Sequence, residues 1–165
     1  MQTIEILDIK PFMQLLFQTE ILDSCAFVSA EIRTDMTYTL DGHVHHEFFT
    51  EEESEQLDIR DQLYLPWNIA KEKVFTLIKG KKTPSLLKVV LKISSEETST
   101  LLSATGSTLH TNDIDGLFLN ITFQENKLHV ICGVSYRIFT MDKELEREFA
   151  DFVIETFKKH NITCA

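Results

Sequence analysis

The segment from Gly116 to Lys159 constrains the fold of this chain more than any other. It opens with a strand pattern over 117–123, where every second residue is apolar, and the polar run Gln-Glu-Asn-Lys then turns the chain. The alternation resumes over 128–132, and from Asp142 the apolar residues recur every three or four positions, as in an amphipathic helix. Because two strands are not stable alone in water, we expect this helix to cover their apolar face.

The same two periods alternate along the rest of the chain, with short polar turns between them. They predict further strands over 3–7, 26–32, 36–40, 43–49 and 87–93, and helices over 8–17, 66–79 and 142–159. Two capping boxes, Thr50 with Glu53 and Ser94 with Glu97, each predict a short helix. We therefore expect an α+β fold: an antiparallel sheet with helices packed on one face, forming a single domain over 1–165.

Several side chains are expected in the core because of their place in these patterns. Phe149 lies in the middle of the apolar stripe of the last helix, and Trp67 begins the stripe of the 66–79 helix. Cys132 alternates with apolar residues on its strand, and Cys25 is expected to be a small buried hydrophobe.

The composition is that of an ordinary globular chain, since 43% of the 165 residues are apolar and 25% are charged. The longest apolar run is far short of the ~20 residues that a membrane span needs, and the start lacks the pattern of a secretory signal. Cys25, Cys132 and Cys164 are odd in number and form no C-x-x-C pair, which is typical of reduced intracellular thiols. We therefore expect a cytoplasmic protein without membrane contact.

The net charge of −10 is unevenly distributed. An acidic block covers residues 51–61, whereas Lys79, Lys81 and Lys82 form a basic cluster after the 66–79 helix. This cluster could contact phosphate, but cations at a helix C-terminus also offset the helix dipole. The overall charge disfavours non-specific nucleic-acid binding, which depends on neutralising phosphates.

The sharpest chemical candidate is the sequence His-Val-His-His-Glu. On the predicted strand 43–49, His43, His45 and Glu47 would share one face, because residues two apart on a strand point the same way. Two imidazoles and a carboxylate are a legitimate ligand set for zinc or iron. The alternative is a solvated strand face. A metal site also needs a ligand from a second element, which the sequence does not place, so we predict no metal, no cofactor and no metalloenzyme.

The order of elements suggests an internal duplication. Halves 1–82 and 83–165 both follow the path strand, helix, strand, strand, helix, with Gly42 and Gly133 at corresponding places. The alternative is chance, since period-2 patterns are common. The doubled arrangement resembles the domains of sliding clamps, although no clamp motif is present and a fold alone does not imply a function.

A second resemblance covers most of the chain. It is carried by the turn Thr-Leu-Asp-Gly at 39–42, the cap Phe-Thr-Glu-Glu-Glu at 49–53, the helix exit Ile-Lys-Gly-Lys-Lys-Thr-Pro at 78–84 and the strand Gly-Leu-Phe-Leu-Asn-Ile at 116–121. These segments resemble an uncharacterised family of small proteins from Gram-positive anaerobic bacteria. The resemblance implies no activity and no catalytic residue.

Three classes of function remain open. A non-catalytic binding or adaptor protein with a protein partner is expected first, because the chain has no P-loop, dinucleotide fingerprint, nucleophile elbow or H-E-x-x-H motif. A clamp-like module associated with nucleic acid comes next, and it depends on the duplication. A small metal-dependent enzyme built on the His-x-His-x-Glu pattern is third.

Overall fold

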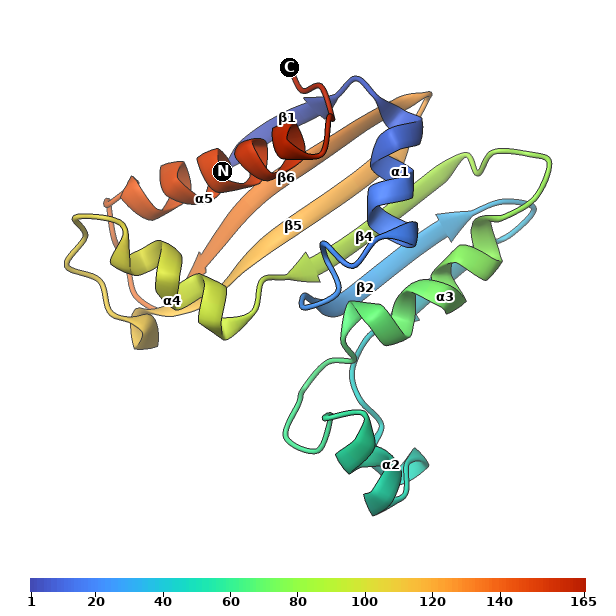
Figure 1. Ribbon diagram of the computed structural model, residues 1–165, viewed down its shortest axis with the longest axis horizontal. Helices are drawn as coiled ribbons and strands as arrows, with labels where there is room; N and C mark the ends of the chain where they lie inside the picture. Colours follow the sequence, from blue (N-terminus) through green and yellow to red (C-terminus); the bar gives the residue numbers. More distant parts are fainter.

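One six-stranded antiparallel sheet forms the centre of the computed structural model, which describes residues 1–165, and helices lie against one of its faces (Figure 1). The strands are β1 (Gln2–Ile6), β2 (Ala26–Arg33), β3 (Thr37–Asp41), β4 (Leu86–Lys92), β5 (Ile114–Gln124) and β6 (Lys127–Tyr136). The helices are α1 (Ile9–Gln18), α2 (Glu51–Gln56), α3 (Trp67–Ile78), α4 (Ser95–Ser103) and α5 (Glu144–Lys159), with 3₁₀ turns at His46–Phe48 and Thr111–Asp113.

The strands lie in the order β1-β6-β5-β4-β2-β3, and every neighbouring pair is antiparallel. The predicted α+β fold is therefore confirmed. None of the helices combines the length and the apolar character that a membrane crossing needs.

The β5–β6 hairpin and α5 form as the sequence predicts. Phe123 lies opposite Leu128, and the two residues between the strands, Glu125 and Asn126, have φ angles of 53° and 61°. Positive φ at both positions is the requirement of a tight two-residue hairpin turn. Phe149 on α5 is fully buried, as expected from its place in the apolar stripe.

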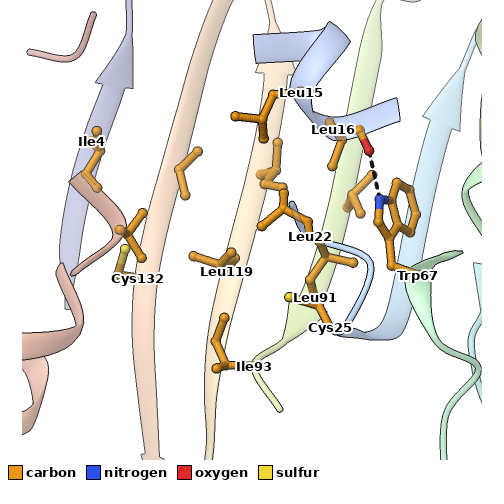
Figure 2. Close-up of a cluster of buried hydrophobic side chains, with 14 of the residues drawn as sticks. Ile4, Leu15, Leu16, Leu22, Cys25, Trp67, Leu91, Ile93, Leu119 and Cys132 are labelled. Atoms are coloured by element: carbon orange, nitrogen blue, oxygen red, sulfur yellow. Dashed lines mark hydrogen bonds between the residues drawn. The ribbon is translucent and has the colours of Figure 1, made fainter. Parts of the chain in front are cut away.

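The core lies between the sheet and α1, α3, α4 and α5, where 32 buried residues form one apolar cluster. Figure 2 shows side chains from the strands and helices meeting in this layer. Trp67 is fully buried, and its indole Nε1 donates a hydrogen bond of 2.9 Å to the backbone oxygen of Leu16 on α1. This bond joins α1 to the first residue of α3 and satisfies the one polar atom of the indole.

The last residues of the chain close the outer edge of β1. Glu5 and Ala165 exchange backbone hydrogen bonds of 3.1 and 2.9 Å. Asp8 precedes α1 but does not cap it with its side chain; its carboxylate accepts a 2.7 Å hydrogen bond from the Thr163 amide instead. Hydrogen bonding to Thr163 lowers the pKa of the Asp8 carboxyl below its ordinary value of 3.8. The Asp8 carboxylate therefore joins the start of α1 to the last residues of the chain.

The internal duplication is not confirmed. The order of elements repeats, but β4 pairs with β5 whereas β1 pairs with β6 and lies far across the sheet from β2. The two glycines also differ in environment. A Cβ on Gly42 would lie 1.8 Å from the backbone oxygen of Phe27, whereas a Cβ on Gly133 would have its nearest neighbour at 3.8 Å. The halves thus contribute differently to one sheet.

The predicted strand over 43–49 is wrong. β3 ends at Asp41, and beyond Gly42 the place beside β2 is taken by the returning side of the arm, since Phe27 donates its backbone hydrogen bond to the oxygen of Leu65. Residues 42–66, which we call the arm, project beyond the end of the sheet and return at the start of α3 (Figure 1). The alternation of Val44 with its neighbours is strand-like, but no sheet partner lies beside this segment except the returning side of the arm.

Candidate functional site

The arm is joined to the body by backbone hydrogen bonds at its base. Leu65 donates to the oxygen of Gly42 and Val44 donates to the oxygen of Leu63, both at 2.9 Å. Phe27 of β2 donates to the oxygen of Leu65 at 2.8 Å, which attaches the returning side to the sheet. The arm is therefore an ordered extension of the β2–β3 end of the sheet.

The arm has a small interior of its own. The capping box at the start of α2 is formed as predicted: Glu53 N donates to Thr50 Oγ1 at 3.1 Å, and Thr50 N donates to Glu53 Oε1 at 2.9 Å. Ile59 is fully buried although it does not belong to the main apolar cluster, and its amide donates to the oxygen of Ser54 at 3.0 Å. Local caps and one buried side chain thus shape the arm.

The surface of the arm combines exposed apolar side chains with carboxylates. Phe48 is 81% exposed and Leu63 is 62% exposed. The Phe48 ring meets the Phe49 ring edge to face, with 5.4 Å between the ring centres. The arm carries seven acidic residues and one basic residue, Arg60, so it holds most of the net negative charge of the chain. The arm therefore presents exposed apolar side chains on a strongly acidic segment.

The three metal candidates lie on the arm but do not share a strand face. His43 Nδ1 pairs with Asp41, and its ring packs on Tyr64 with 4.7 Å between the ring centres. His45 Nδ1 lies 3.5 Å from Glu47 Oε1. The two imidazoles thus have separate carboxylate partners, and no group of three or more His, Cys, Asp or Glu side chains is close enough to hold a metal ion.

The three lysine candidates lie at the far end of α3 from the arm. The amide of Lys79 closes α3 by donating to the oxygen of Phe75 at 2.9 Å, and Gly80 follows with φ of 150°. Lys81 and Lys82 continue the exposed turn toward β4. These lysines form no ion pair and sit at a helix C-terminus, where positive charge offsets the helix dipole.

An open groove of about 720 Å³ runs beside α3. Its apolar lining consists of Phe17, Ile69, Phe75 and Leu77. Lys71, Glu72, Lys73, Thr76 and Lys79 provide the polar lining. Lys71 is held by Asp23, with Nζ and Oδ1 2.7 Å apart, whereas Lys73 and Lys79 have no acidic partner. We call this feature the α3 groove; sequence reasoning did not predict it, because it forms where α1 and α3 pack together.

A second cleft, of about 590 Å³, lies between the base of the arm and the β4–α4 junction. Tyr64, Lys92 and Ser94 line it, together with Cys25. Burial raises the pKa of the Cys25 thiol to about 12, so the thiol is protonated at neutral pH and is a poor nucleophile. The expectation that Cys25 is a buried hydrophobe is confirmed, and the cleft contains no activated nucleophile of this kind.

A further exposed apolar stretch lies between β6 and α5. Ile138, Phe139 and Met141 are all exposed, Phe139 by 92%. Unlike the arm, this stretch has no helix or strand of its own and no block of like charge beside it. The arm is therefore the better-defined candidate for recognition.

Sequence reasoning found the charge of the arm but missed its shape. The acidic block was expected only to begin a short helix. The available signal was the pair Phe48-Phe49 immediately before that block, because two aromatic residues within a strongly acidic segment are poor candidates for a buried strand.

The fold and the arm define a small α+β protein with one projecting element. The chain belongs to a family of unknown function, DUF5721, whose model matches residues 14–164. This confirms the resemblance to an uncharacterised family, while the match carries no information about the organisms in which that family occurs. Neither a curated protein nor a solved structure matches the chain.

Proposed function

We propose that this protein is a non-catalytic binding or adaptor protein, and that its arm docks on a protein partner. The observation that carries the proposal is the exposure of Phe48, 81%, on an ordered element that projects from the body. Burying a Phe side chain on binding is worth about 1.5–3 kcal/mol, and aromatic residues are frequent anchors in protein interfaces. An ordered element that presents such a residue to solvent is well suited to be an anchor.

The charge of the arm predicts the chemistry of the surface to which it binds. Seven acidic residues lie on the arm together with the anchor, so the complementary surface is an apolar pocket with Lys or Arg at its rim. Opposite charges of this kind speed association and exclude acidic competitors. The same carboxylates repel phosphate, and for this reason we propose a protein partner and not a nucleic acid. We also propose a cytoplasmic location, which is supported by the three free cysteines.

The two other classes of function have less structural support. The clamp-like module depended on a duplication that the strand order does not support, and the metal-dependent enzyme depended on a strand face that is not present. Phosphate contact by Lys79, Lys81 and Lys82 stays a prediction: it requires binding of duplex DNA at ~50 mM salt that falls steeply as salt rises. No shift of the DNA under these conditions would remove it.

Site-specific photo-cross-linking in the cells that make the protein tests the proposal. A benzophenone amino acid at position 48 should yield one discrete protein adduct. The same group at position 36 is the matched control, because Met36 is also exposed but lies at the opposite end of β3 from the arm. Reversing the charge of Glu51 and Glu52 to Lys should weaken the adduct. No adduct at position 48, or the same adducts at both positions, would refute the arm as a docking element.

A further inference from the structure

The α3 groove has the chemistry that the arm requires of its partner. Phe17 and Phe75 lie in its lining with 5.5 Å between their ring centres, and both stay only partly buried. An aromatic side chain placed here would bury its own apolar surface and theirs together.

The charge of the groove is opposite to that of the arm. Three lysines, Lys71, Lys73 and Lys79, line the groove against one carboxylate, Glu72, and Lys81 and Lys82 follow, on a chain whose net charge is −10. Lys73 and Lys79 line the groove and form no ion pair within the chain. Carboxylates beside a docked anchor would therefore meet lysines that have no partner of their own, and charges interact over about 8 Å at physiological salt.

We infer that the partner of the arm is a second copy of this chain, and that the arm of one copy docks in the α3 groove of the other. This inference rests on the proposed function of the arm. The arm leaves α3 at Pro66, whereas the lysines follow the other end of the helix, and the arm projects away from the body (Figure 1). Each contact joins two different surfaces, and because both copies give an arm and receive one, the dimer interface as a whole is isologous, with twofold symmetry. Two copies that exchange arms close a dimer with two equivalent contacts.

Sedimentation of the full chain over about 1–200 µM, the range of micromolar dissociation constants, tests the inference. The unchanged protein should form a dimer. Phe48→Ser removes the anchor, and the double variant Lys73→Glu/Lys79→Glu removes the charge of the groove; each should be monomeric. Lys88→Glu/Lys127→Glu is the matched control, because it makes the same change of charge at exposed positions on the sheet, and it should still dimerise. Unchanged thermal unfolding shows that each variant is folded.

A mixture of the two variants provides the most discriminating measurement. The Phe48→Ser chain keeps its groove, and the Lys73→Glu/Lys79→Glu chain keeps its arm, so a mixture of the two restores one of the two contacts. We expect a mixed dimer at concentrations where each variant alone is monomeric, weaker than the unchanged dimer. In the purified protein a benzophenone at position 48 should attach to a peptide within residues 69–79 of the other copy.

The experiments distinguish a failure of this inference from a failure of the proposed function. A chain that stays monomeric throughout, a dimer that neither variant weakens, or a mixture that does not associate would overturn the arm-in-groove contact. The proposed function would still stand if position 48 cross-linked a different protein in cells. The proposed function would also be refuted if a benzophenone at position 48 gave no adduct in cells.

Discussion

The body and the arm of this molecule are stabilised in different ways. The body encloses 32 clustered apolar residues between a sheet and four helices. The arm encloses one fully buried apolar residue, Ile59, and otherwise depends on a helix cap and on backbone hydrogen bonds at its base. Free energy of local opening follows buried apolar area, so the arm is expected to open more readily than the body. The surface that we propose for recognition thus belongs to the less stable part.

Phe149→Ala should produce the largest effect and defines the stability of the body. The side chain is fully buried on α5, and its removal leaves a cavity against the sheet. We expect the free energy of unfolding to fall by about 3–5 kcal/mol in chemical denaturation. A loss under about 1 kcal/mol would show that the stripe of α5 does not contribute to the core as described.

Trp67→Phe tests the junction where the arm returns to the body. It removes the hydrogen bond to Leu16 and leaves a buried carbonyl without its partner, which costs about 1–3 kcal/mol in the free energy of unfolding. Tyr136→Phe is the matched control: the Tyr136 hydroxyl is buried and has no hydrogen-bond partner, so its removal should leave the stability nearly unchanged. Equal losses in the two variants would contradict the role of the indole bond.

Ile59→Ala separates the arm from the body most directly. The change should lower the free energy of local opening by about 2–5 kcal/mol, so that proteases cut within residues 42–66 much faster. Because the main core is untouched, the midpoint of global unfolding should hardly move. If global unfolding were destabilised as strongly as in Phe149→Ala, the arm and the body would be one cooperative unit and the comparison would fail.

Asp8→Asn should have the smallest effect on stability, and that effect should depend on pH. The pKa of Asp8 is lowered in the folded chain, so its ionised form stabilises the fold. That contribution is present above the unfolded pKa, near 3.8, and is lost as pH falls through the lower folded pKa. Unchanged protein should therefore lose more stability than Asp8→Asn between neutral pH and pH 3 in thermal unfolding. Parallel curves for the two would exclude a contribution from the tie to Thr163.

The parts of the fold that could be predicted from the sequence are those set by local periodicity. The β5–β6 hairpin, α5 and the burial of Phe149 follow from residues close together in the chain. The strand expected at 43–49 could not be excluded in this way, because its place beside β2 is taken by Leu65, which is more than fifteen residues further along the chain. The role of Asp8 was missed for the same reason, since its partner, Thr163, is at the other end of the chain.

The same distinction between short segments and distant contacts applies to the candidate site. The charge of the arm and the exposed lysines after α3 are properties of short segments and could be predicted as such. The α3 groove depends on Phe17 of α1 lying beside Phe75 of α3, and the separation of His45 from His43 depends on where the chain leaves the sheet. Neither arrangement is encoded within a single segment.

The pairing of β1 with β6 has a consequence for the time course of folding. Ile4 lies opposite Val130, so during synthesis the first strand emerges long before its neighbour exists. β2, β3 and β4 are adjacent in the sheet and can associate earlier. Ile4 and Ile6 of β1 are buried in the folded protein, but they stay exposed to solvent until β6 has been synthesised. Pairings between distant segments slow folding and leave strand edges open to other chains. The nascent protein is therefore most vulnerable to aggregation at its N-terminal strand until β6 is complete.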